Sequence, residues 1–174
     1  MWVGLFAEMS EFALMFIVYF ITRANYPEVF SAGPETLSTV AGVTNTLIMI
    51  TSSYCIARAV FAMRADQVKT SFRWLLAALV IGIGYPIVKY FEFSWNMSYG
   101  LTGNGDVFQM TYYYLTFNHM IHVFWGLIGL CWVMYSTHLR VYSAKEYSGL
   151  EAFACFWHIT DLIWLIIFPL FYLL

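Results

Sequence analysis

Ionisable side chains lie inside the most hydrophobic parts of this sequence, and their spacing could support metal, haem or proton chemistry. His119 and His122 are three residues apart in the segment TFNHMIHVFWGLIGL, and His158 and Asp161 repeat that spacing near the end of the chain. In a helix, residues three apart lie on one face. Each pair could therefore act together, either in chemistry or in hydrogen bonds between helices.

Carboxyl groups occur in equally apolar surroundings. Glu8 and Glu11 are three residues apart, and Glu11 lies about ten residues into an apolar segment, close to mid-membrane at about 1.5 Å per residue. A charge at that depth costs about 2.5–3.5 kcal/mol, so we expect Glu11 to be buried beside a partner. Lys89 and Glu92 are also three apart, which allows an ion pair near the outer end of a helix. A buried structural or proton-linked role is expected for nine residues: Glu8, Glu11, Asn45, Glu92, His119, His122, Glu151, His158 and Asp161.

The pattern of these residues excludes some chemistry and leaves other chemistry open. A di-iron carboxylate bundle uses Glu-x-x-His on two helices, and this sequence has no such motif. We see no nucleophile beside a base, so we expect no catalytic residue. Hydrogen bonds between helices explain the polar groups more simply than cofactor-binding or metal-binding roles do. Haem needs only one or two axial histidines, so a small haem-binding oxidoreductase using His119, His122 or His158 is one alternative. A proton-coupled transporter with a relay from Glu11 to His119 is another, although no internal repeat supports it.

The elements that must position these side chains are membrane helices. The chain is 61% hydrophobic and 10% charged, with a mean hydropathy of +0.71, whereas soluble domains average about 25% charged residues. No alternating pattern predicts barrel strands. Each apolar run exceeds or approaches the roughly 20 residues that span a bilayer; the runs are 3–21, 38–63, 72–95, 108–137 and 147–173. The sequence therefore predicts an all-α polytopic membrane protein, with residues 1–174 as a single transmembrane domain.

Basic residues predict how this bundle lies in the membrane. The second and third runs are linked by a segment with Arg64, Lys69 and Arg73, and the fourth and fifth by one with Arg140 and Lys145. The link at 96–107 has no basic residue. Lysine and arginine favour cytoplasmic loops, so we expect a cytoplasmic N-terminus and an external C-terminus.

A kink is predicted within the third run. Pro86 follows Gly82 and Gly84, and a proline inside a helix removes one backbone hydrogen bond.

Three segments carry a resemblance to subunit III of the haem–copper oxidases. GLEAFACFWHITDLIWLIIFPL resembles that family's last helix, with matches at Glu151, Ala152, Trp157, His158, Asp161 and Trp164. NHMIHVFWGL resembles its His-x-x-His-Val element and following glycine, with matches at His119, His122, Val123 and Gly126. GLFAEMSEFALMF resembles the helix with the family's buried Ser-Glu pair, and further matches are Ser10, Glu11, Asn45, Thr46 and Glu92. Asn118 departs from the pattern, because the family often has glycine there.

Two segments narrow the resemblance. The family has short five-helix forms in bacterial oxidases and in the accessory subunit of bacterial nitric oxide reductases. MTYYYLTFNHMIHVFWGL and the FPLFYL ending look closest to the second of these. Longer family members have two further helices at the front, and those helices form one arm of a lipid-holding cleft.

The resemblance implies a non-catalytic integral subunit of a respiratory complex that reduces oxygen or nitric oxide. Haem and a second metal are then expected in a partner catalytic membrane subunit, and no cofactor in this chain. Phospholipids are expected to bind, and the subunit is expected to support assembly, stability and proton uptake. The expected location is the bacterial cytoplasmic (inner) membrane, and nothing in the sequence points to a nucleic-acid partner.

Overall fold

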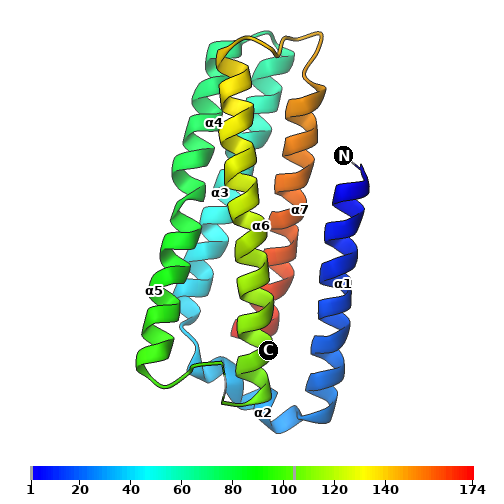
Figure 1. Cartoon of the computed structure of the whole chain (residues 1–174). Helices are drawn as coiled ribbons and strands as arrows, with labels where there is room; N and C mark the ends of the chain where they lie inside the picture. Colours follow the sequence, from blue (N-terminus) through cyan, green and yellow to red (C-terminus); the bar gives the residue numbers. More distant parts are fainter. Residues whose placement is uncertain (1, 104) are drawn as a thin grey trace.

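The chain is an α-helical bundle (Figure 1). A computed structural model describes residues 2–103 and 105–174. Five segments are long and apolar enough to cross a membrane, and they comprise α1 (Trp2–Asn25), α3 (Thr39–Arg64), α4 (Val68–Gly82) continued by α5 (Gly84–Ser98), α6 (Val107–His138) and α7 (Ser148–Tyr172). The expectation of an all-α polytopic membrane protein with five helical spans is confirmed.

The third span is interrupted where the sequence predicts a kink. Gly82 ends α4, Gly84 begins α5, and Ile83 between them lies outside both helices. Pro86 is the third residue of α5, so its missing N–H weakens the helix at this step. The span is also longer than predicted at both ends.

The first connection contains helical structure that the apolar runs do not predict. α2 (Pro27–Ala32) and a 3-10 helix (Gly33–Thr36) lie under the bundle. Proline is favoured in the first turn of a helix, and Pro27 begins α2. Phe30 is buried against the rings of Tyr19 and Phe108, which anchors α2 to the bundle.

The helices pack unequally. α3 packs against α4, α5 and α7, and α6 packs against α7 and α4, whereas α1 lies at the edge and meets the bundle chiefly through sparse contacts with α6 and α7. Figure 1 shows α1 set apart, with its start well below the far end of the bundle.

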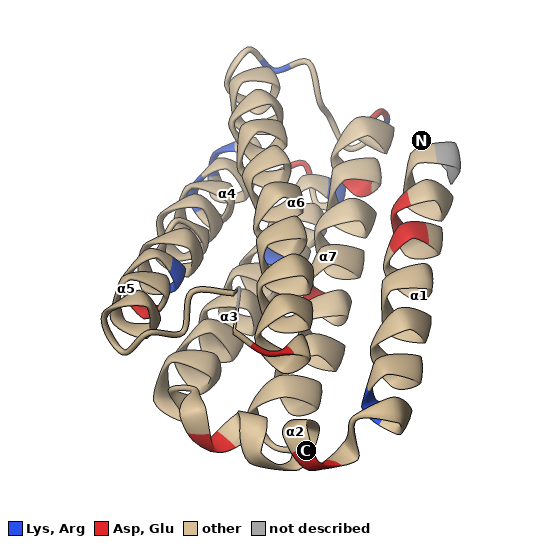
Figure 2. Ribbon diagram, turned by 60° about the horizontal axis from the view of Figure 1, so that its bottom comes forward, with Lys and Arg blue, Asp and Glu red and all other residues tan. Residues whose placement is uncertain are grey.

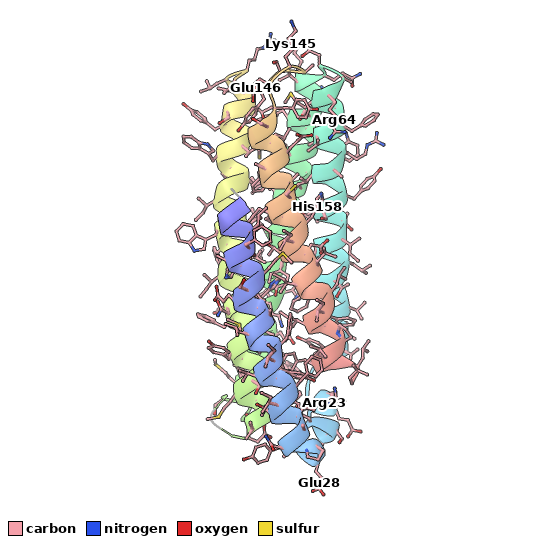
Figure 3. All side chains as sticks on the ribbon, turned by 90° about the vertical axis from the view of Figure 1, so that its right-hand side faces the viewer. Arg23, Glu28, Arg64, Lys145, Glu146 and His158 are labelled. Atoms are coloured by element: carbon pink, nitrogen blue, oxygen red, sulfur yellow. The ribbon has the colours of Figure 1, made fainter. Side chains whose placement is uncertain are left out.

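The α3–α4 and α6–α7 connections lie at the same end of the bundle (Figures 1 and 2). In Figure 3, Arg64 and Lys145 mark that end, which we call the basic end, while Arg23 and Glu28 mark the opposite end.

Candidate functional site: three polar clusters in an apolar bundle

The first cluster surrounds Lys89, which is fully buried. Its ammonium Nζ lies 2.9 Å from Glu92 Oε2 and donates hydrogen bonds to the hydroxyls of Tyr172 at 2.7 Å and Tyr112 at 3.2 Å. Both tyrosines in turn donate to Glu92 Oε1. The ammonium also lies 4.9 Å from the centre of the Trp164 ring, a cation–π distance. The cluster therefore joins α5 to α6 and α7.

The expected Lys89–Glu92 ion pair is present, and both side chains have 0% exposure. The pair is therefore enclosed by the protein. Its hydroxyl partners Tyr112 and Tyr172 were not expected from the sequence.

The second cluster attaches α1 to the bundle. His122 Nδ1 lies 3.2 Å from Glu8 Oε1, and its Nε2 lies 3.6 Å from Glu11 Oε2. Thr160 of α7 donates to Glu8 Oε1 at 3.0 Å. One imidazole thus lies between two carboxyl groups of α1, and α7 supports the inner one.

The burial of these two carboxyl groups corrects the sequence analysis. Glu8 is 4% exposed, whereas the Glu11 side chain is 45% exposed. Three residues at 100° each leave Glu11 about 60° around the helix from Glu8. Because α1 packs on one side only, this turn carries Glu11 out of the bundle. The expected close partner of Glu11 is present, and it is His122.

The third cluster lies between α3 and α7. The hydroxyl of Ser53 is hydrogen-bonded to His158 Nδ1, so this imidazole links α7 to α3. Asp161 is buried at 7% exposure, and its Oδ1 has no hydrogen-bond partner among the described residues. Nearer the basic end, Arg64 Nη2 lies 2.6 Å from Glu151 Oε1.

Glu151 is therefore not one of the buried groups. Its side chain is 41% exposed, because it lies in the first turn of α7, where the helix emerges from the bundle.

His119 and Asn45 are fully buried in the middle of the bundle. The His119 ring stacks on Trp164, with ring centres 5.5 Å apart, and meets the edges of Tyr85 and Phe12. Neither ring nitrogen of His119 and neither amide atom of Asn45 has a hydrogen-bond partner within the described part of the chain.

The two histidines of α6 consequently have different surroundings. His122 faces α1, whereas His119 faces the aromatic interior. Glu11 contacts His122 and makes no ion pair with His119, so the relay from Glu11 to His119 considered above has no direct contact in the structure.

Taken together, the three clusters join helix to helix. Each cluster draws on at least two helices, and α7 takes part in all three. Within residues 2–103 and 105–174, no group of three or more His, Cys, Asp or Glu side chains is placed to hold a metal ion. The chemistry that this arrangement can perform is to fix helix positions and to hold protons at lipid depth.

Comparison with known proteins gives consistent matches over nearly the whole chain. Residues 4–174 match the family model described as cytochrome c oxidase subunit III. Cytochrome c oxidase subunit 3 of Thermostichus vulcanus is 30% identical over 173 residues, which cover 99% of this chain and 84% of the relative. Probable cytochrome c oxidase subunit 3 of Mycobacterium tuberculosis is 25% identical over 170 residues, which cover 98% of this chain and 84% of the relative.

A third relative is a much longer protein. Heme-copper oxidase subunit I+III of Aeropyrum pernix is 28% identical over 181 residues, which cover 99% of this chain and 22% of that protein. This chain therefore spans about a fifth of the length of that relative.

Proposed function

Because the chain belongs to the cytochrome c oxidase subunit III family, we propose that it serves as a non-catalytic membrane subunit of a respiratory complex of the haem–copper oxidase type. The observation that carries this proposal is the family match over residues 4–174. Five helices long and apolar enough to cross a membrane agree with a multi-pass subunit.

The proposed partner is the catalytic membrane subunit, which would hold the haem and the second metal. The relative from Aeropyrum pernix is named subunit I+III, so in that protein the two subunits form one polypeptide. A separate chain of this family would bind the same partner through contacts within the membrane.

The surroundings of the histidines disfavour the alternative of a haem-binding oxidoreductase. His122 is engaged with two carboxyl groups, and His158 is hydrogen-bonded to Ser53. His119 has 0% exposure and is enclosed by aromatic rings, so a haem could reach it only by displacing them.

The proposed contribution to the complex is structural. The three clusters fix the order of the helices, and the bundle would thereby support assembly and stability of the complex. Phospholipid binding and support of proton uptake complete the proposal. For proton uptake we assign Glu8, Glu11 and His122, because intramembrane ionisable residues mark proton routes and the Glu11 side chain is 45% exposed at the surface of the chain.

The proposal also covers the branch of the parent complex and the placement of the chain in the membrane. We assign the parent complex to the nitric oxide reductase branch, on the resemblance of the segments around Tyr112 and at the end of α7. We place the chain in the bacterial inner membrane with its basic end in the cytoplasm, following the distribution of lysine and arginine.

Purification of the tagged full chain from its native membrane under mild detergent tests the proposal. We expect a larger haem-containing subunit to co-purify in a constant ratio, and the complex to reduce nitric oxide. A complex that reduces oxygen alone would contradict the branch assignment and leave the family role intact. A chain that is always recovered alone would contradict the role itself.

A further inference from the structure

The cations at the basic end of the bundle are of two kinds. Arg64 is paired with Glu151, and the Arg58 guanidinium lies 5.4 Å from the centre of the Trp74 ring. Other cations near the connections have no carboxylate within 4.0 Å among the described residues; they include Lys69, Arg73 and Arg140. A cation that served only as a signal for membrane orientation would need no particular neighbour. A binding site, in contrast, requires several cations close together.

All three line one cavity. A hollow of about 340 Å³ lies between the beginning of α4 and the end of α6. Lys69 and Arg73 come from α4, and His138 and Arg140 come from the end of α6, about 70 residues away along the chain. No aspartate or glutamate lines this cavity. The ring of Phe72, which also lines it, lies 5.9 Å from the ring of His138.

A second hollow adjoins the first. It is also lined by Lys69 and Arg140, and it adds the hydroxyl-bearing residues Thr70, Tyr142 and Ser143. Asp66 lines this second hollow, where its Oδ1 accepts a hydrogen bond from the backbone N–H of Ala144.

The backbone at Arg140 is strained. Its φ is +57°, in the left-handed region, where a helix end normally uses glycine. Two backbone hydrogen bonds close the turn at the end of α6. The N–H of Arg140 donates to the carbonyl of Thr137, and the N–H of Val141 donates to the carbonyl of Ser136. A charged side chain kept at a position that favours glycine points to a function for that side chain.

The shape of the surroundings indicates an amphiphilic ligand. The cations lie where α4 begins and α6 ends, which are the ends of two of the candidate membrane spans. Seven-residue steps keep to one face of a helix. From Lys69 one such step reaches the exposed apolar residue Leu76, and from His138 two steps reach Phe124. A negatively charged group in the cavity would thus have apolar helix surface directly beneath it.

We propose that the cavity between the start of α4 and the end of α6 binds the phosphate of an anionic phospholipid, held by Lys69, Arg73 and Arg140. Basic pockets between membrane helices on the cytoplasmic side suit such headgroups. The inference rests on the lipid-holding role proposed above, and it gives that role a location and a ligand class. The acyl chains would lie along the exposed apolar faces of α4 and α6.

Native mass spectrometry of the full chain in detergent, titrated with phosphatidylglycerol, tests this site. Arg140→Gly removes the charge and relieves the left-handed backbone, so the variant should fold at least as well as the parent. Arg73→Gln removes a second charge from a regular helix. We expect each variant to bind phosphatidylglycerol about fivefold more weakly, since one interfacial cation contributes about that factor.

Lys145→Gln is the matched control, because it removes one positive charge at the same end of the molecule from a residue that lines neither hollow. Its affinity should equal that of the parent, and phosphatidylcholine should bind the parent more weakly than phosphatidylglycerol does. Unchanged binding in both variants, or an equal loss in Lys145→Gln, would overturn the site. Displacement of the lipid by millimolar inorganic phosphate would also overturn it, in favour of a site for free anions. None of these results depends on co-purification of a catalytic subunit, so failure of this inference and failure of the proposed function are distinguishable.

Discussion

A lysine inside a membrane bundle is tolerated only where its charge is matched, and Lys89 meets that condition through Glu92 and two tyrosine hydroxyls. Both carboxylate oxygens of Glu92 also have partners. This complete set of hydrogen bonds offsets the cost of removing two charges from water. Loss of one charged residue of the pair should therefore destabilise the protein more than loss of both.

Lys89→Met should lower the free energy of unfolding by about 3–5 kcal/mol, because it leaves the Glu92 carboxylate buried without a counter-charge. The double variant Lys89→Met, Glu92→Gln should recover part of that loss. Denaturant unfolding of the full chain in detergent, followed by tryptophan fluorescence, measures both. A double variant less stable than Lys89→Met alone would contradict the pairing.

The hydrogen bond between Ser53 and His158 should couple α3 to α7. A double-mutant cycle with Ser53→Ala and His158→Leu should give a coupling energy of about 0.6 kcal/mol and at most about 1.7 kcal/mol, the range for hydrogen bonds between membrane helices. The same unfolding assay measures it, and a coupling energy of zero would rule out a contribution of this bond.

Replacement of Asp161 by leucine separates a structural from a chemical role. Because Asp161 lies within the helix packing, we expect Asp161→Leu to reduce the yield of assembled complex while turnover per assembled complex stays unchanged. The amount of complex purified measures assembly, and turnover normalised to haem content measures activity per assembled complex. Loss of turnover in a fully assembled, metal-replete complex would instead indicate a direct proton role.

The sequence predicted the kinds of residue in the site better than their burial. The spacing of Lys89 and Glu92 was enough to predict an ion pair. Which of Glu8 and Glu11 faces inward depends on how α1 is rotated against α6 and α7, and the spacing of two carboxyl groups on one face does not specify that rotation. A buried lysine needs several hydrogen-bond acceptors, and this requirement could have predicted Tyr112 as a partner of Lys89.

At the scale of helices, small residues decide how closely α6 and α7 approach. A Cβ atom added at Gly126 would lie 2.7 Å from Cζ3 of Trp157, which is fully buried. The glycine matched in the sequence analysis therefore permits a helix contact, as small residues do in membrane bundles.

Gly126→Val should accordingly cost about 1–3 kcal/mol through overpacking against Trp157. Gly4→Val is the matched control, because it makes the same side-chain change within a helix and a Cβ at Gly4 has no atom within 4 Å. Thermal unfolding of the two variants in detergent compares them. Equal destabilisation would show that the contact between Gly126 and Trp157 contributes nothing.

The sequence predicted the long helices well and the short ones poorly. Apolar runs longer than a bilayer define α1, α3, α6 and α7 to within a few residues. α2 depends on burial of Phe30 against Tyr19 and Phe108, residues from two other helices, and a local pattern does not contain that information.

At the scale of the whole molecule, charge distribution sets the orientation that we propose. Both basic connections lie at one end (Figure 2). With the basic end in the cytoplasm, a cysteine introduced at Thr102, in the α5–α6 connection, should react with a membrane-impermeant maleimide in intact spheroplasts. A cysteine at Lys145 should react only after the membrane is permeabilised. The reverse pattern would contradict the orientation.

The most direct measurement of whether this chain is a subunit without its own prosthetic group is the visible absorption spectrum of the full chain, purified free of partners from haem-replete cells. We expect no Soret band from the chain, and a strong Soret band from the complex isolated with its large subunit. A stoichiometric Soret band from the chain alone, lost when His119 or His122 is replaced, would contradict a non-catalytic role.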